Sequence, residues 1–209
     1  MKKIDFRLYL VTDRKLVTHY ASLITAVRQA LTGGVKAVQL REKDLEVREL
    51  LKLAYKMREL TSKYKAKLFI NDRLDIALAV GADGVHLTQN SIPADAVRKV
   101  VKDKLIIGVS THSLKEAKEA EQGGADFITF GPVYKTPSKL KYGAPFGIDV
   151  LKQVSGKVRI PVFAIGGIKS HRIEEVKKSG AFGVAMISEI FGAEDIKRKA
   201  RELINILER

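Results

Sequence analysis

Polar side chains that can bind anions or metal ions recur just after short apolar runs in this chain. One run contains Gln39 and is followed closely by Arg41 and Lys43. The run LFI is followed by Asn71 and Asp72. Arginine and lysine neutralise phosphate oxygens, and a carboxylate can hold a divalent cation that bridges to the same oxygens. These residue types therefore indicate a site for a substrate that carries several phosphate charges.

Hydroxyl, imidazole and ammonium groups follow two later apolar runs. Ser110 and His112 come after LIIGV, and Thr136, Ser138 and Lys139 come after FITFGPV. Histidine moves protons near neutral pH, whereas the hydroxyl and ammonium groups bind anionic oxygens. The chain contains no cysteine. This set of groups therefore favours charge neutralisation and positioning over attack by a side-chain nucleophile.

Two further apolar runs end in small residues beside an expected helix N-terminus. The run IPVFAIGG at 160–167 ends in Gly166 and Gly167, and GAFGVAMIS at 180–188 ends in Ile187 and Ser188. Parallel α/β barrels hold a phosphate in this way after their seventh and eighth strands, with backbone N–H groups and a helix dipole aimed at the anion. The alternative is that these glycines only permit tight packing between helices and strands.

Several of the charged residues also have a purely structural interpretation. Arg41 and Lys43 can form ordinary surface ion pairs with Glu42 and Asp44. Asp72 can cap the helix that follows it. Each of these alternatives predicts a contact that a structure can test.

The four histidines differ in what their surroundings predict. His86 is expected in the core, and His19 and His171 lie at helix starts where we expect them to face solvent. His112 stands beside Ser110 at a strand end, but its Thr-His-Ser segment also makes a plausible N-cap for the next helix.

The apolar runs alternate with amphipathic stretches, as expected of β and α units on a parallel sheet. Strands are expected at 8–11, 36–40 and 68–71, and helices at 19–31, 47–64, 72–81 and 114–121. Helices end in glycine just before an apolar strand at Gly34, Gly81, Gly124 and Gly180. The expected strand centres are Leu8, Val38, Phe69, Val85, Ile106, Ile128, Val162 and Val184.

Eight such units in about 200 residues predict a (β/α)8 barrel that occupies residues 1–209 as a single domain. An open doubly wound sheet is the alternative, and it is disfavoured because no G-x-G-x-x-G follows an early strand. In a barrel the carboxyl ends of all strands meet on one rim, which would bring the polar residues above together.

A formal net charge of +14 is the unusual feature of the composition. It is compatible with nucleic-acid binding, with steering of anionic substrates, or with the lysine-rich surface that thermophiles carry. The basic residues are interleaved with acids along helices, as in KLAYKMRELTSKYKAK. We therefore expect surface charge and steering rather than a nucleic-acid partner.

The same composition bounds where the protein acts. No apolar run approaches the ~18 residues needed to span a bilayer, so no membrane association is expected. The basic N-terminus places Asp5 and Arg7 inside what would be the apolar part of a signal peptide. Without cysteine or such a leader, we expect a cytoplasmic enzyme. A homodimer is left open, because barrels of this size often pair.

A family resemblance joins these segments. LYLVTDR, QLREKD, FINDR, GADGVHLTQ, IGVSTHS, GADFITFGPVYKTPSK, IPVFAIGGI and GVAMIS together resemble the thiamine phosphate synthase and TenI superfamily, in order and through nearly the whole chain. The resemblance implies a (β/α)8 barrel. It also implies a transferase of thiamine biosynthesis that joins a hydroxymethylpyrimidine diphosphate to a thiazole phosphate, releases pyrophosphate and uses Mg2+.

The resemblance also implies a role for each candidate residue. Asp72 would bind magnesium, and Ser110 and Lys139 would contact the pyrophosphate and pyrimidine end of the substrate. The pyrimidine diphosphate would be held by Gln39, Arg41, Lys43 and Asn71. The thiazole phosphate would be held by Thr136, Ser138, Gly166, Ile187 and Ser188.

Two segments depart from the synthase pattern. Ser91 stands where synthases usually carry a second magnesium-binding aspartate. The segment Thr136-Pro137-Ser138-Lys139, followed by YGAPFG, is more similar to the TenI branch, whose members are thiazole tautomerases. In that branch the residue matching His112 is the acid and base. We therefore expect a synthase, with a tautomerase as the alternative and a non-catalytic phosphate-binding regulator as the least favoured reading.

Overall fold

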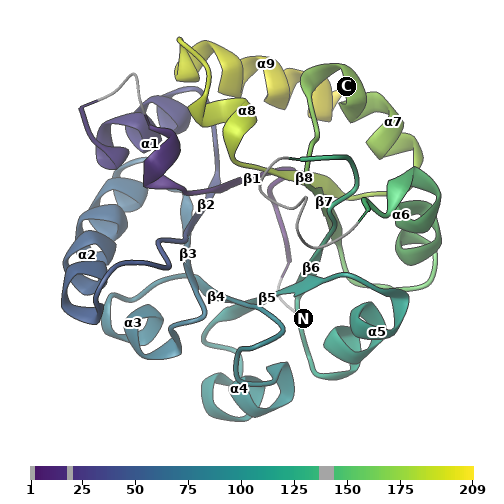
Figure 1. Ribbon diagram of the computed structural model, residues 1–209. Coiled ribbons are helices and arrows are strands. Elements are labelled where there is room, and N and C mark those ends of the chain that lie inside the picture. The colour runs from purple at the N-terminus through teal and green to yellow at the C-terminus, as the bar shows by residue number, and fades with distance from the viewer. Residues whose placement is uncertain (1–2, 18–20, 137–143) are drawn as a thin grey trace.

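The protein folds into a closed barrel of eight parallel strands with helices on its outside, seen along the barrel axis in Figure 1. The computed structural model describes residues 3–17, 21–136 and 144–209. Neighbouring strands pair in sequence order, and β1 closes the barrel by pairing with β8. The strands are β1 (Leu8–Val11), β2 (Ala37–Leu40), β3 (Lys67–Asn71), β4 (Gly84–Leu87), β5 (Ile106–Thr111), β6 (Phe127–Phe130), β7 (Val162–Ile165) and β8 (Gly183–Met186).

The helices surround this barrel, and the predicted (β/α)8 fold is confirmed. In the described part of the chain, two short 3-10 helices, η1 (Arg14–Leu16) and η3 (Ser170–Arg172), lie in loops after β1 and β7. The α-helices are α1 (Leu23–Thr32), α2 (Val47–Lys63), α3 (Leu74–Ala79), α4 (Ala94–Val101), α5 (Leu114–Gln122), α6 (Gly147–Ser155), α7 (Ile173–Lys178), α8 (Ser188–Phe191) and α9 (Ile196–Glu208).

The first helix begins later than the sequence pattern predicts. Its N-cap is Ser22, whose hydroxyl accepts a hydrogen bond from the backbone N–H of Thr25. The expected start at His19 lies outside the described residues. The capping serine, rather than the start of the apolar pattern, therefore sets where α1 begins.

The four helix-ending glycines all have positive φ, from 61° at Gly81 to 106° at Gly34. An L-residue with a side chain rarely adopts this left-handed backbone, which ends a helix and redirects the chain. The recurrence of glycine before four of the eight strands, which the sequence pattern used to count units, therefore has a conformational cause.

The interior of the barrel is filled by side chains rather than open. Phe6 lies before β1, and its ring centroid is 5.2 Å from that of Phe163 and 5.8 Å from that of Phe69. Tyr9 and Phe127 join the same cluster. A second and larger cluster packs the outer faces of the strands against the helices. No helix in the part of the chain that the structure describes is long and apolar enough to cross a membrane.

Candidate active site at the carboxyl ends of the strands

The ends of β2 and β3 are joined by two amide side chains. Gln39 Nε2 donates a hydrogen bond of 2.9 Å to Asn71 Oδ1. Gln39 is buried, and Asn71 is the half-buried last residue of β3. The sequence predicted both at one rim, and the structure brings them into direct contact. Each amide is oriented by the other before any ligand binds.

Thr12 and Glu42 hold the loop after β2 that carries Arg41 and Lys43. The buried Thr12 hydroxyl accepts from the backbone N–H of Arg41 at 2.9 Å and donates to Glu42 Oε1 at 2.6 Å. The loop therefore has one defined conformation, in which Glu42 turns inward and the residues on either side of it are partly or fully exposed.

The carboxylates of this loop are engaged by the loop after β1. Arg14 contacts Glu42 at 3.2 Å and Asp44 at 2.5 Å, and Lys15 contacts Asp44 at 2.9 Å. Hydrogen bonds from Arg14 and Lys15 hold the pKa of Asp44 well below its usual range. The structure thus shows two partners for these carboxylates, Arg14 and Lys15, that the surface-pairing alternative for Arg41 and Lys43 did not include. Sequence reasoning missed Thr12 and Arg14, although both lie in the VTDR motif.

Asp72 directly follows β3 and is exposed. Its φ of 64° is left-handed, and its backbone N–H donates to the carbonyl of His86 at 2.9 Å. The prediction that Asp72 caps the next helix is wrong, because the N-cap of α3 is Arg73 and no side-chain capping bond forms. The chain turns sharply at Asp72 before α3 begins.

His86 lies inside the barrel rather than on its rim. It is 2% exposed, and its Nε2 is 3.0 Å from Ser110 Oγ. Burial, together with the positive charge of Arg41, lowers the pKa of His86 to about 3, so the imidazole is neutral. The expectation of a core histidine is confirmed, and the core position also contacts a candidate site residue.

His112 follows β5 and is half-buried. Its Nδ1 donates to the carbonyl of Gly131 at 2.5 Å, and its ring stacks on Phe146 with centroids 6.2 Å apart. Ser113, the next residue, is the N-cap of α5 and accepts from Glu116 N. The segment therefore caps the helix as predicted, and the ring of its histidine is oriented by the Nδ1 hydrogen bond. His171 is exposed in η3, and His19 lies outside the described residues.

The paired glycines after β7 pack against the segment after β6. Both have left-handed φ, 97° at Gly166 and 66° at Gly167. A Cβ on Gly166 would lie 2.7 Å from Pro132 Cα, and one on Gly167 would lie 2.6 Å from the carbonyl oxygen of Lys135. Both glycines therefore permit a close approach between two loops, which differs from the helix–strand packing of the alternative, and the phosphate role stays a prediction.

The loop after β7 is also tied to the helix after β8. Glu189 accepts from the backbone N–H and the hydroxyl of Ser170 at 3.2 and 3.1 Å, and pairs with Lys169 at 2.8 Å. Ser188 is the first residue of α8, and Ile187 is its N-cap. These contacts hold the two predicted phosphate-binding segments together. Thr136 is described, whereas Ser138 and Lys139 lie outside the described residues.

Ser91, in the loop after β4, is engaged locally. Its hydroxyl accepts from the backbone N–H of Thr88 at 2.7 Å and lies 3.1 Å from the Thr88 hydroxyl. Together with the backbone bond from Ser91 N to the carbonyl of Thr88, it closes a short turn. Within the described ranges, no group of three or more histidine, aspartate or glutamate side chains is placed to hold a metal ion.

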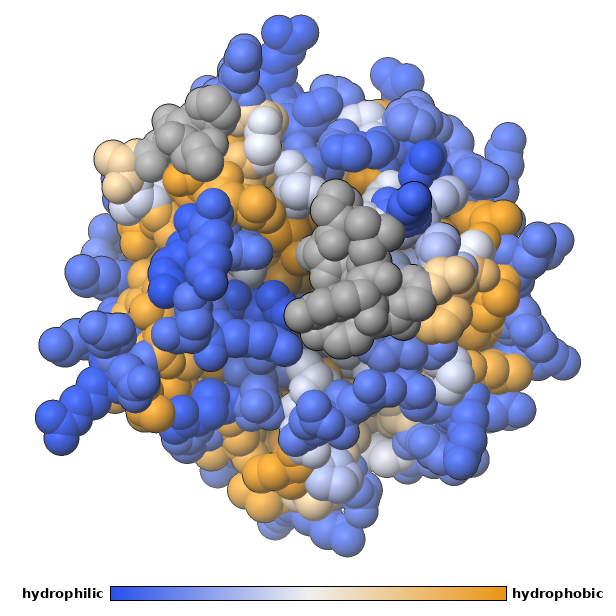
Figure 2. All heavy atoms as spheres, viewed as in Figure 1, coloured by the Kyte–Doolittle hydropathy of each residue, from blue (hydrophilic) through white to orange (hydrophobic). Residues whose placement is uncertain are grey.

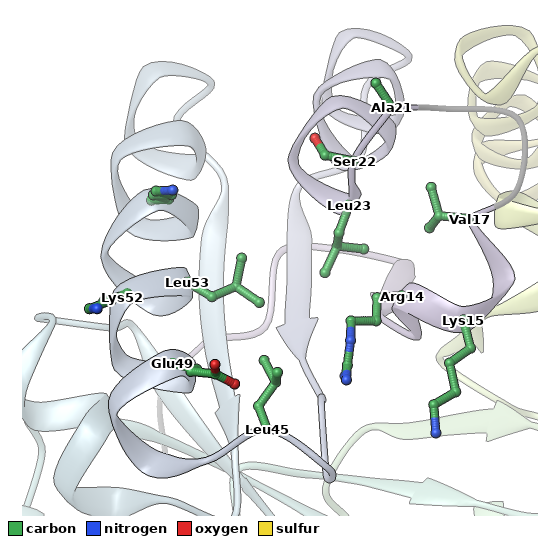
Figure 3. Close-up of a pocket in the computed structure, with 11 residues that line it drawn as sticks. Arg14, Lys15, Val17, Ala21, Ser22, Leu23, Leu45, Glu49, Lys52 and Leu53 are labelled. Atoms are coloured by element: carbon green, nitrogen blue, oxygen red, sulfur yellow. The ribbon is translucent and has the colours of Figure 1, made fainter.

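A separate hollow of about 780 Å3 lies between α2 and the segment around η1 and the start of α1. Leu23, Leu45 and Leu53 face one another across it, and Arg14 and Lys15 lie on one side (Figure 3). Both basic side chains are already paired with Asp44. The other charged residues of its lining, Glu49, Lys52 and Lys56, all come from α2, whereas the strand ends gather polar groups from several strands.

Polar side chains from β2, β3 and β5 thus gather at one end of a closed parallel barrel. Figure 2, in the same view as Figure 1, shows hydrophilic residues beside the centre of that face. Enzymes built on the (β/α)8 barrel place their reactive groups at the carboxyl ends of the strands. Fold and site together define a barrel enzyme.

Comparison with known proteins gives the particular family. The sequence profile of the thiamine monophosphate synthase family matches residues 8–190. The chain is 45% identical over 204 residues to the thiamine-phosphate synthase of Halalkalibacterium halodurans, covering 98% of this chain and 96% of that protein. It is 42% identical over 209 residues to the enzyme of the same name from Clostridium acetobutylicum, covering 100% and 98%.

A solved structure agrees with these relatives. Thiamine phosphate pyrophosphorylase from Pyrococcus furiosus superposes with a TM-score of 0.88 at 40% identity, covering 97% of this chain and 96% of that one. The chain belongs to the thiamine monophosphate synthase family.

Proposed function

We propose that this protein is a thiamine-phosphate synthase. It would condense 4-amino-2-methyl-5-(diphosphooxymethyl)pyrimidine with a thiazole phosphate to give thiamine phosphate and pyrophosphate. The observation that carries the proposal is the 42–45% identity, over at least 98% of the chain, to proteins that bear this name. The preformed contact of Gln39 with Asn71, next to the clamped loop of Arg41, supports the same conclusion.

The chemistry needs positioning and charge neutralisation rather than a nucleophilic side chain. The bond between the pyrimidine methylene and its diphosphate oxygen breaks, and both electrons leave with the pyrophosphate. The thiazole nitrogen then donates its lone pair to the methylene carbon. Arg41 and Lys43 would neutralise the departing oxygens, while Gln39 and Asn71 hold the pyrimidine end.

Asp72 is the residue that we propose for magnesium. Its exposed carboxylate fits a cation that commonly keeps several waters and is held by one or two carboxylates together with substrate phosphates. Bound there, magnesium would supply further charge neutralisation to the diphosphate. Ser91 would leave the place of a second carboxylate to water.

The thiazole phosphate would bind on the other side of the mouth. Gly166, Ile187 and Ser188 are proposed to hold it through their backbone, because the loops that carry them are tied together by Glu189. Thr136, Ser138 and Lys139 complete the proposed set. We further propose a cytoplasmic enzyme that acts on small phosphorylated substrates without a nucleic acid, with a homodimer as its assembly.

One observation favours a second candidate, thiazole tautomerase. His112 Nδ1–H donates a hydrogen bond to the carbonyl of Gly131, which orients the ring and leaves Nε2 as the nitrogen available to exchange a proton with a ligand. A tautomerase moves a proton on the thiazole phosphate carboxylate and would use that nitrogen. It would have no need of a diphosphate site at Arg41 and Lys43.

The deciding experiment gives purified protein both synthase substrates, with and without magnesium. We expect thiamine phosphate to form only with magnesium, and Asp72→Ala to abolish turnover. Ser91→Asp should lower the magnesium concentration needed, and His112→Ala should have little effect. Asp75→Ala is the matched control, because Asp75 is an exposed aspartate on α3 that pairs with Arg73.

A tautomerase would respond to magnesium and to these variants in the opposite way. No coupling would be seen at saturating magnesium, whereas exchange of the thiazole proton would survive EDTA and Asp72→Ala. That exchange would fall about 10²–10⁴-fold in His112→Ala, the usual effect of losing a general acid or base.

A further inference from the structure

A chain of four polar side chains runs through the interior of the barrel to its mouth. Tyr9 Oη lies 3.4 Å from His86 Nδ1, and His86 Nε2 lies 3.0 Å from Ser110 Oγ. Thr129 donates to the same Ser110 oxygen at 3.4 Å. Tyr9, His86 and Thr129 are buried, whereas Ser110 is half-buried. Only the last member of the chain therefore faces partly open space.

The fold makes room for this chain. A Cβ on Gly108 would lie 2.7 Å from His86 Nδ1, so glycine at that point of β5 leaves space for the imidazole ring. The ring of Tyr9 is packed among Phe6, Phe69 and Phe127. Neither ring can turn away without disturbing the core.

Donor and acceptor counts fix the direction of the hydrogen bonds. Burial raises the pKa of the Tyr9 hydroxyl well above its usual value, so the phenol keeps its proton. His86 Nδ1 is the hydrogen-bond partner recorded for that hydroxyl among the described residues. Nδ1 must then accept, and the single proton of the neutral imidazole lies on Nε2.

The same reasoning continues to Ser110. His86 Nε2–H donates to Ser110 Oγ, and Thr129 donates to it as well. A serine oxygen has two lone pairs and one proton. With both lone pairs used, its O–H is the group left to face the mouth of the barrel.

We propose that Tyr9 and His86 are positioning residues that fix the Ser110 hydroxyl as a hydrogen-bond donor toward an anionic oxygen of the ligand. The identity of that oxygen, on the departing pyrophosphate, rests on the proposed function. With the other tautomer, Ser110 would donate to His86 and turn a lone pair toward the anion. Tyr9 thus determines whether Ser110 attracts or repels the anionic oxygen, although His86 lies between Tyr9 and Ser110.

The tautomer can be measured without any activity. In the 15N-labelled protein, long-range 1H–15N correlation spectra should show His86 with its proton on Nε2, the signal being assigned by its loss in His86→Gln. In Tyr9→Phe the Nδ1 partner is gone, and we expect a mixture of tautomers. A wild-type spectrum with the proton on Nδ1 would refute the proposal even if the enzyme makes thiamine phosphate.

Kinetics test the consequence for the reaction. We expect Ser110→Ala to lower kcat/KM by about 10- to 100-fold, the range for one hydrogen bond to a charged group. Tyr9→Phe should lower it by a smaller factor, and the double variant should equal Ser110→Ala alone. His86→Gln, which keeps an N–H for Ser110, should retain more activity than His86→Leu.

Tyr64→Phe is the control, because that hydroxyl bonds to Thr32 at the helix layer, away from the barrel interior. It should leave kcat/KM unchanged. If Tyr9→Phe folds with an unaltered melting temperature and full activity while Ser110→Ala is impaired, Tyr9 has no positioning role. If no variant or wild-type protein couples the substrates, the proposed function fails, and the tautomer spectrum still decides the orientation of Ser110.

Discussion

At the scale of single residues, the buried His86 makes the stability of the folded protein depend on pH. Its imidazole is buried and neutral, with a pKa lowered to about 3 by burial and by Arg41. In the unfolded chain an exposed histidine has a pKa near 6.5. Between these two values the unfolded state binds one more proton than the folded state, so acid favours unfolding.

We therefore expect the free energy of unfolding to fall by about 2 kcal/mol from this residue alone between pH 6.5 and 5, at up to about 1.4 kcal/mol per pH unit. The stabilisation is fully present above pH 6.5 and is lost progressively as the pH falls toward 3. Denaturant unfolding across this window measures the slope. His86→Gln should flatten that slope whatever its own stability, and equal slopes in both proteins would contradict the assignment.

The residue types of the sequence predicted where polar side chains lie in the barrel better than they predicted which side chains contact one another. The sequence predicted that Gln39 and Asn71 share a rim, because the register of parallel strands brings carboxyl ends together. It did not predict that Arg14 and Lys15, which come from a different strand end, pair with Glu42 and Asp44. It also predicted a cap at Asp72, where a left-handed backbone instead makes the chain turn before the helix.

At the scale of elements, the two loops after β6 and β7 behave as one unit. Val133 N donates to Ile165 O at 2.9 Å, and Tyr134 N donates to Gly166 O at 3.0 Å. The Arg172 guanidinium lies 4.2 Å from the centre of the Tyr134 ring and donates to Gly167 O. Glycine at 166 thus permits both the left-handed backbone conformation and the close approach of Pro132.

A pair of alanine variants separates these two effects. Gly81→Ala places a side chain at a left-handed position with nothing within 4 Å, so it should cost about 1–2 kcal/mol through φ alone. Gly166→Ala adds the clash with Pro132, for about 1–3 kcal/mol more.

Urea unfolding gives both stability changes, and steady-state kinetics give the functional one. Under the proposed function, Gly166→Ala should also raise KM for the thiazole phosphate, while Gly81→Ala leaves it unchanged. A Gly166→Ala protein with normal KM would leave the glycine with its packing role alone.

Strands were easier to predict than helices for a physical reason. A parallel strand covered on both faces is a continuous apolar run, and such runs marked all eight strands. Helix bounds depend on local capping contacts, and so α1 begins at Leu23, behind a serine whose hydroxyl closes its first turn. Short helices such as α8, with four residues, have too few turns to leave a periodic pattern.

At the scale of the whole molecule, a protein with a net charge of +14 has a site that is proposed to receive anions. Excess positive charge speeds the encounter with such ligands, and dissolved salt screens it over about 10 Å at 0.1 M. The exposed ion pairs on the helices, such as Lys63 with Glu59, are worth little to stability. The charge should therefore be visible in association rates more than in the melting temperature.

We expect kcat/KM for the pyrimidine diphosphate to fall steadily as potassium chloride is raised from low to high concentration, with kcat nearly constant. Rapid-mixing measurements of the association rate provide the direct test. Duplex DNA added at physiological salt should bind weakly and without sequence preference. Tight, sequence-selective DNA binding would instead revive the regulator interpretation.

The aromatic side chains at the other end of the barrel have a consequence for substrate entry and product release. Phe6 packs on Tyr9, Phe69, Phe127 and Phe163, so aromatic rings fill the interior of the barrel at this end. Among the residues that the structure describes, this packed interior leaves a molecule that reacts in the mouth no route through the barrel. Products must therefore leave through the same opening by which substrates enter. Under the proposed function, product that stays bound at this opening should delay the next turnover.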